Sequence, residues 1–242
     1  MVNIVQVTAR MSDGRIASLY DSSVSDNSTT AISTGGSGLA QTSGLSLGQA
    51  YPGSTVTHIG ATVEGGGSSA FNIAFIEGGN GQCKYVIPIS GGGTGEMPAC
   101  VFPVKLDVGD ICKVRVCTSD ATEVDACVGV LYSDRSEAVF QVAAVADTKT
   151  ELTNLIQGTT TWGQTAAGKV ATHYYATYNN SGGLNDDGAG NNFFYVEDSA
   201  GQLKGVMYPQ ICRNTAYPGP TEWTQIPIPV AQNDSLFVMW GS

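Results

Sequence analysis

The chain contains only two histidines, and both stand in the same short phrase. His58 lies in "THIGAT" and His173 in "THYYAT", each downstream of a Gly-Gln pair that begins at Gly48 or Gly163. A histidine can act as a general base or bind a metal. These two occupy equivalent positions far apart in the sequence, on the polar side of alternating segments. We therefore expect surface or interface residues of two similar domains, and no joint catalytic site.

Acidic residues suggest two further chemistries. Glycoside hydrolysis needs paired carboxylates, and the acidic residues that recur include Asp110 and Asp234, each after a Gly or Asn and before an apolar segment. Because an aspartate at such a turn bonds nearby backbone amides, we interpret Asp110 and Asp234 as structural turn residues. Asp186 and Asp187 lie in "NDDGAGNN" and offer oxygen ligands for calcium, but the bidentate glutamate of an EF-hand loop is missing. They stay weak calcium candidates in a segment that we expect to be a flexible loop.

The remaining residue types form no catalytic constellation. The sequence has no Gly-x-Ser-x-Gly elbow and no phosphate-binding or dinucleotide-binding motif. Its six cysteines form no Cys-x-x-Cys pair, which argues against zinc and favours thiols in a reducing compartment. A disulfide between Cys117 and Cys127 is the alternative. The sequence therefore predicts no enzymatic activity, no cofactor and no metal.

The charge of the chain argues against two classes of partner. It has 11 Lys and Arg against 21 Asp and Glu, a net charge of −10. Nucleic-acid binders cluster basic residues to neutralise phosphates, and an anionic membrane surface requires the same, so neither partner is expected. The N-terminal "MVNIVQVTAR" lacks the features of a signal peptide, and no apolar run reaches the roughly 20 residues of a membrane span. We expect synthesis in a cytoplasm.

The two histidine phrases belong to an internal repeat. The stretch 48–62 matches 163–177 without a gap, and "EGGNGQCK" then matches "EDSAGQLK". Further on, "FPVKLDVGDICKVRV" matches "IPIPVAQNDSLFVMW", and upstream "IVQVTA" is matched with "VFQVAA". Because the order is kept and the offset changes only at loops rich in Gly and Asn, we infer a tandem duplication with a boundary near Asp134.

Alternating apolar and polar residues between glycine turns predict β-strands. In the first domain, 1–134, we expect eight strands: 3–9, one within 29–47, 55–64, 70–77, 82–89, 100–106, 110–118 and 125–133. Short strands in this number favour an all-β fold of two tandem jelly-roll or β-sandwich domains. The second domain, 135–242, ends after the counterpart of the seventh strand, so its last strand is missing or borrowed. Only 147–156 has helical character.

Aromatic residues gather in the second copy, in "HYYATY" and "NFFYV". Half of each alternating run is expected to fill the core. Tyr175, however, falls on the same side as His173, where it could contact a sugar or a neighbouring subunit. We take His58, His173 and Tyr175 as candidate interface or ligand contacts.

The segment "FPVKLDVGDICKVRV", two apolar strands around a Gly-Asp turn, resembles the final hairpin of trimer-forming jelly rolls, including those of phage and viral capsid proteins. With its tandem β-sandwich copies and only 13% charged residues, the whole chain resembles virion structural proteins. The resemblance implies two jelly rolls in one subunit, as in double jelly-roll major capsid proteins. The chain is short for that family and its second copy lacks a final strand, so a capsid cement or decoration protein is equally expected.

The resemblance also implies a location and partners. The protein would be made in the host cytoplasm and incorporated into the virion, where it contacts itself and other capsid proteins. A homotrimer is expected, because few charges cover the surface and strand edges must be paired or covered. The alternative is a tandem β-sandwich module that binds a carbohydrate or a receptor through "HYYATY" and "NNSGGLNDDGAGNN".

Overall fold

The computed structural model describes residues 3–24, 28–35, 42–65, 71–90, 97–117, 124–144, 149–178, 193–208, 211–212 and 223–239. They form mostly β-strands with two short helices, so the predicted all-β class is confirmed. The chain divides into two compact units. Of the described residues, 3–117 belong to the first unit, and 124–212 with 223–239 to the second.

The nine described strands of the first unit form one continuous hydrogen-bonded sheet, which we divide into two parts, sheet A and sheet B. Sheet A has the order β2-β1-β4-β8 and contains β2 (Ile16–Val24), β1 (Asn3–Met11), β4 (Thr55–Gly65) and β8 (Ala99–Lys105), with β7 (Ile89–Ser90) on β4. Sheet B has the order β3-β9-β5-β6 and contains β3 (Ser28–Thr34), β9 (Ile111–Cys117), β5 (Phe71–Glu77) and β6 (Cys83–Ile87). The two parts join where β3 pairs with β2 as well as with β9. Along the chain, β2, β4 and β8 of sheet A alternate with β3, β5–β6 and β9 of sheet B.

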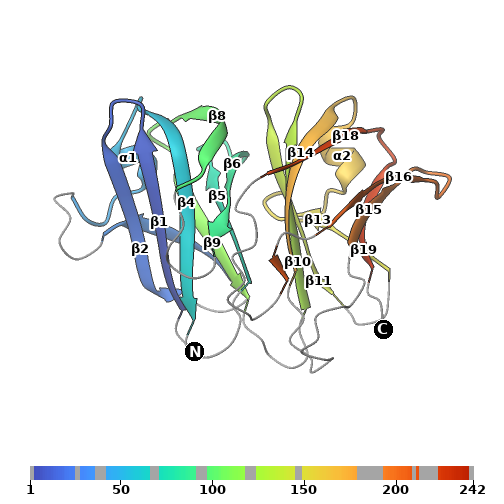
Figure 1. The fold of residues 1–242 in the computed structure, drawn as a ribbon, viewed down its shortest axis with the longest axis horizontal. Coiled ribbons are helices and arrows are strands. Elements are labelled where there is room, and N and C mark those ends of the chain that lie inside the picture. Colours follow the sequence, from blue (N-terminus) through green and yellow to red (C-terminus); the bar gives the residue numbers. More distant parts are fainter. Residues whose placement is uncertain are drawn as a thin grey trace. The chain divides into compact units, whose positions relative to one another are not determined.

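The second unit repeats this plan. Sheet C contains β13 (Thr153–Asn154), β11 (Glu137–Ala144), β10 (Val124–Tyr132) and β14 (Val170–Tyr178), with β17 (Ile211–Cys212) and β18 (Thr224–Pro229) on β14. Sheet D contains β12 (Thr150–Glu151), β19 (Ser235–Met239), β15 (Phe193–Glu197) and β16 (Leu203–Met207), in that order. Figure 1 shows β15, β16 and β19 side by side in sheet D.

The pairing register is the same in both units. Ala9 on β1 lies opposite Ala17 and Ile59. Val130 on β10 lies opposite Ala138 and Tyr174, the equivalent positions of the second unit. A β-bulge follows in each case, between Arg10 and Met11 and between Leu131 and Tyr132. The units therefore share one strand plan, and the gene duplication stays an inference from the sequence repeat.

The predicted boundary near Asp134 is wrong. The segment that we expected to be the eighth strand of the first domain, 125–133, is β10, which pairs with β11 and β14 along most of its length. It opens the second unit, so this unit lacks no strand. In the first unit the equivalent place is filled by β1. The upstream match of "IVQVTA" with "VFQVAA" is also wrong, because the pairing register aligns β1 with β10 and not with β11.

Strand β2 was missed and the helix was misplaced. The sequence "IASLYDSSV" carries exposed Ile16 and Tyr20 among polar residues, so its alternation is weak. The described part of 147–156 contains β12 and β13, and Asn154 closes a turn there by accepting hydrogen bonds from the amides of Ile156 and Gln157. Helices occur instead at α1 (Leu47–Ala50) and α2 (Trp162–Ala166).

The repeated Gly-Gln pair lies in these two helices, and the glutamine caps them. In α1, the Gln49 side chain accepts from the Ser46 amide at 3.0 Å, and Ser46 Oγ accepts from the Gln49 amide at 3.2 Å. In α2, Gln164 accepts from the Thr161 amide at 3.0 Å. This is the capping box, which satisfies amides at the helix start.

The glycine of the pair is required by close backbone packing. The Gly48 amide donates to the carbonyl of Asp110 at 3.0 Å, and the Gly163 amide donates to that of Asp234 at 2.9 Å. A Cβ at Gly48 would lie 2.0 Å from the carbonyl oxygen of Asp107, and one at Gly163 would lie 2.4 Å from that of Gln232. Each helix therefore packs directly against the turn that contains the repeated aspartate.

The core of the second unit shows what the helix buries. Trp162 of α2 is fully buried and lies 5.5 Å from the Phe140 ring and 6.0 Å from the Tyr132 ring, between ring centroids. Leu47 of α1, the equivalent residue in the first unit, is also fully buried. Each helix thus inserts one large apolar side chain into the core of its unit. Burial of its apolar area stabilises the fold by about 2 kcal/mol.

The tight packing of Gly48 yields a first prediction. We expect Gly48→Ala and Gly163→Ala to lower the free energy of unfolding by about 1–3 kcal/mol or more, because the added methyl group meets immobile backbone. Gly35→Ala is the matched control, since its Cβ would meet no atom nearer than 3.9 Å. Urea titration followed by circular dichroism measures the difference. Equal stability of the Gly48 and Gly35 variants would contradict the packing.

Candidate functional site

The repeated polar side chains form one lysine–aspartate anchor in each unit. In the first anchor, Lys84 on β6 donates to Oδ2 of Asp110 at 2.6 Å, and the Asp110 side chain is only 1% exposed. Lys84 also donates to the carbonyl of Lys105 and to the Asp107 carboxylate, both at 2.9 Å. The lysine thus joins the edge strand β6 to the segment that connects β8 and β9.

The second anchor has the same geometry. Lys204 on β16 donates to Oδ2 of Asp234 and to the carbonyl of Pro229, each at 2.5 Å. The Asp234 side chain is again 1% exposed. Ala231 stands where the first anchor has Asp107, so this anchor lacks the second carboxylate. The repeated part is therefore one lysine, one buried aspartate and one backbone carbonyl.

Both aspartates also bind their own turn. Oδ2 of Asp110 accepts from the Asp107 amide at 2.8 Å, and Oδ2 of Asp234 accepts from the Ala231 amide at 2.7 Å. These are the backbone bonds that the turn interpretation assigned to the two aspartates. The lysines were missed, although Lys84 and Lys204 align in the repeated segments "EGGNGQCK" and "EDSAGQLK". Their presence in both copies was the available signal.

The electrostatics of the anchor suit an ion pair. Burial lowers the pKa of Lys84, but hydrogen bonds to Asp110 and Asp107 outweigh this effect, so the net pKa is raised. The hydrogen bond from Lys84 lowers the pKa of Asp107. The raised pKa favours the charged form of the lysine, so the anchor stabilises the junction of these strands as an ion pair.

The two histidines mark a bulge in each unit. The Nδ1 atoms of His58 on β4 and His173 on β14 lie 3.1 Å from Oγ1 of the preceding threonine. The hydroxyl of Thr57 donates to the carbonyl of Arg10, and that of Thr172 to the carbonyl of Leu131, beside the bulges. Both histidines are half-buried, and burial lowers the pKa of His173. They lie in separate units, and each has a structural partner.

The structure contradicts one candidate contact. Tyr175 is fully buried, and its ring lies 6.5 Å from that of Trp223 between centroids. The expectation that Tyr175 offers an exposed contact is therefore wrong, because a residue distant in sequence packs against it. Asp186 and Asp187 lie outside the described residues. Among the residues that are described, no group of three metal-binding side chains occurs.

The cysteines do not pair as the alternative suggested. Cys83, Cys100, Cys112 and Cys127 are thiols, and burial raises the pKa of Cys112. Cys127 lies on β10 of the second unit, whereas Cys117 ends β9 of the first. A Cys117–Cys127 disulfide between strand neighbours is excluded, because Cys127 is a thiol and the two strands belong to different sheets.

A second polar contact, between a cation, a serine and an aspartate, recurs in both units. The cation comes from a different segment in each unit. In the first unit Arg15 bonds to Ser54 at 2.8 Å and to Asp13 at 2.7 Å. In the second unit Lys169 bonds to Ser136 at 2.6 Å and to Asp134 at 2.9 Å. The register that aligns the units places Ser136 at the position of Arg15. Each cation also lies 5.4 Å from a tyrosine ring centroid, that of Tyr51 or Tyr132.

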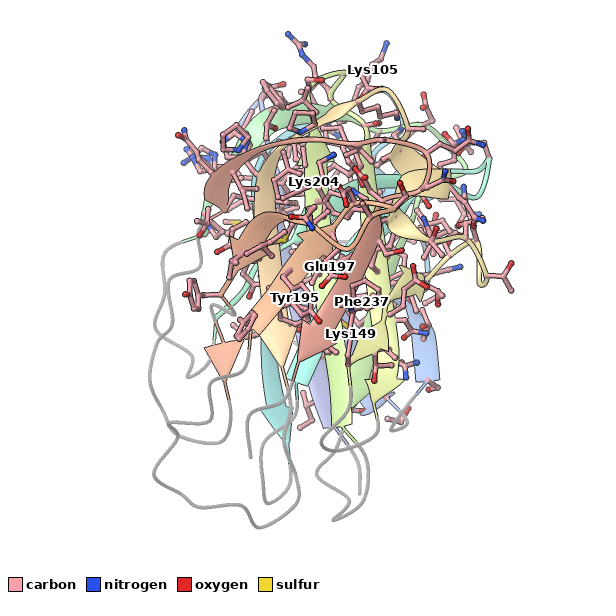
Figure 2. The ribbon with its side chains drawn as sticks, turned by 90° about the vertical axis from the view of Figure 1, so that its right-hand side faces the viewer. Lys105, Lys149, Tyr195, Glu197, Lys204 and Phe237 are labelled. Atoms are coloured by element: carbon pink, nitrogen blue, oxygen red, sulfur yellow. The ribbon has the colours of Figure 1, made fainter. Side chains whose placement is uncertain are left out.

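Sheet D carries an aromatic cluster on its outer face. Phe193 and Phe237 each lie 5.6 Å from Tyr195 between ring centroids. The Lys149 ammonium lies 4.1 Å from the Phe237 centroid and bonds to Glu197. Figure 2 shows Lys149, Glu197, Tyr195 and Phe237 together over β15 and β19. In the first unit, Glu77 instead pairs with Lys113 at 2.7 Å.

Comparison of the chain with protein-family models, with curated proteins and with solved structures gives no match. Within the described ranges, no helix has the length and apolar character needed to cross a membrane. The function has to be inferred from the residues of the chain itself.

The buried anchor yields a second prediction. Lys84→Met leaves the Asp110 carboxylate buried without its cation, which costs about 3–5 kcal/mol for a fully buried pair. Since the Lys84 side chain is 23% exposed, we expect a loss near the lower end. Asp110→Ala and Asp234→Ala should also lower the melting temperature, because turn amides lose their acceptor.

The control for this prediction is Arg15→Met. Its pair with Asp13 is about half exposed on both sides, and such exposed pairs contribute little to stability. Thermal unfolding followed by circular dichroism compares the variants. If Lys84→Met were as mild as Arg15→Met, the anchor would not be a stabilising element.

Asp134 yields a prediction on pH. Burial raises the pKa of Asp134, but hydrogen bonds from Ser136 and Lys169 outweigh this effect. The resulting pKa is about 2. An unfolded aspartate has a pKa of about 3.9, so the folded state is stabilised above that pH, and this stabilisation is lost as the pH falls toward 2. We expect Asp134→Asn to lower the melting temperature slightly at pH 7 and to flatten its decline below about pH 4. An unchanged decline would contradict the assignment.

Proposed function

We propose that the chain is a non-enzymatic structural protein of a virion that self-associates in or on an icosahedral capsid. The observation that carries the proposal is the pair of β-sandwich-like units with one strand plan, which we interpret as a jelly roll, in a chain with 13% charged residues. Jelly rolls are frequent in viral capsid proteins and in lectins. A fold alone does not define a function, so the residues have to separate these two uses.

The recurring residues support a scaffold. The carboxylates of Asp110 and Asp234 are occupied by a lysine and a backbone amide in each unit. Gly48 and Gly163 are needed for close packing of the helices. What the two units share is therefore what holds their strands together, as expected if the protein is selected for a durable shape.

The carbohydrate- or receptor-binding alternative has less support. It relied on an exposed Tyr175, which is buried, and on the segment 179–192, which lies outside the described residues. The proposal includes both a shell-forming subunit and a decoration protein. In either role the contacts are with other copies of the chain or with other capsid proteins.

Self-association gives the test of the proposal. We expect light scattering after gel filtration to give a particle mass of three times the 25.1 kDa of one chain, or of assemblies of such trimers. Because the chain has few charges, we expect the same mass at low salt and at about 0.5 M salt. A stable monomer at micromolar concentration in both buffers would remove the shell-forming role.

A further inference from the structure

We propose that the outer face of sheet D in one copy of the chain binds the outer face of sheet A in a second copy, with Glu151 facing Arg10. This inference rests on the proposed self-association and names the surfaces that carry it. Its basis is a match between two faces of the same chain in apolar residues and in charge.

On the outer side of sheet D, a row of residues runs across all its strands, and Tyr195 in this row is itself buried. Glu151 on β12 and Tyr195 on β15 both lie opposite Phe237 on β19, and Tyr195 lies opposite Val206 on β16. The alternating residues Leu236 and Val238 belong to the core, so this row points outward. Phe237 and Val206 are half-buried, and nearby Leu203 is 62% exposed.

Strand β15 is apolar on both sides along most of its length. In "FFYVE" of β15, Phe194 and Val196 fill the core, while Phe193 and Tyr195 point away from it. A sheet with one side in water normally alternates apolar and polar residues, whereas a strand covered on both sides is apolar throughout. Strand β15 therefore has the composition of a strand that is covered on both sides.

One oxygen on this face lacks a partner. Oε1 of Glu151 is buried, and no described residue donates a hydrogen bond to it. The neighbouring cation, Lys149, is bound to Glu197, so these two charges cancel and Glu151 leaves the face with one negative charge. Glu151 is half-buried and lies on the edge strand β12, so its carboxylate contributes this charge to the face.

The outer face of sheet A offers the complement. Arg10 on β1 lies opposite Ile16 on β2 and His58 on β4, in a row on the outer side, because Ala9 and Met11 are buried. Arg10 is exposed and forms no ion pair with any described residue. Beside it, Ile16 is 57% exposed and Tyr20 37%. This face thus supplies one unpaired guanidinium among exposed apolar side chains.

The charges identify the occupant as a second copy. Among the described residues, the Glu151 carboxylate and the Arg10 guanidinium have no ion-pair partner, and both lie on this chain, so each copy carries both halves of the contact. Since the two faces differ, the contact is heterologous, and such contacts close into rings when the rotation permits. The contact would also involve His58, one of the interface candidates.

The test is a charge exchange in the full chain, followed by light scattering after gel filtration. Arg10→Glu and Glu151→Arg each place like charges together, and we expect each to weaken self-association by about tenfold or more. The double variant Arg10→Glu with Glu151→Arg restores opposite charges, so it should associate like the parent protein. Arg10→Lys, which keeps the charge, is the matched control and should remain associated.

Melting temperatures of all variants separate loss of folding from loss of contact. The proposal is overturned if both single reversals associate like the parent, or if the double variant stays dissociated while it melts normally. A parent protein that is monomeric would remove this inference together with the proposed self-association. A parent trimer that tolerates every reversal would leave the proposed function standing and remove only this interface.

Discussion

A buried carboxylate has to be paired, and each unit is organised around that requirement. Asp110 and Asp234 lie almost wholly out of water at the turn before the last strand of their unit. In each, Oδ2 accepts from a lysine of an edge strand and from an amide of its own turn, whereas Oδ1 of Asp110 is buried without a partner among the described residues. The helix glycine packs on the same turn. The buried aspartate thus joins an edge strand, a turn and a helix in each unit. This junction requires a lysine on the edge strand, a glycine in the helix and a fixed conformation of the turn.

The sequence allowed part of this to be predicted. Local chemistry identified the aspartates as turn residues, and alternation identified most strands, because both depend on near neighbours. Lys84 was missed because its partner lies 26 positions away, on another strand. The assignment of β10 to the first unit was wrong for the same reason. Its sequence predicts a strand in either unit, and only its pairing with β11 and β14 shows that it belongs to the second.

The two units show which features of a contact are required. The cation beside the first hairpin is Arg15 on the hairpin in one unit and Lys169 on the facing segment in the other. Likewise, Glu77 is bound by Lys113 of the adjacent strand, whereas Glu197 is bound by Lys149. Adjacent antiparallel strands bring either position to the same place. Each unit therefore keeps the ion pair, while the segment that supplies the cation differs between the units.

The units differ most on their outer faces. Where β1 and β2 of sheet A carry Arg10 and Ser18, the equivalent strands of sheet C carry Leu131 and Val139, both buried. Tyr175, also buried, stands where β4 has Gly60. Anchors and core fix one shape twice, whereas outward side chains do not affect the strand plan and can change independently. A protein built from two like units can in this way keep one strand plan while the residues outside each core differ.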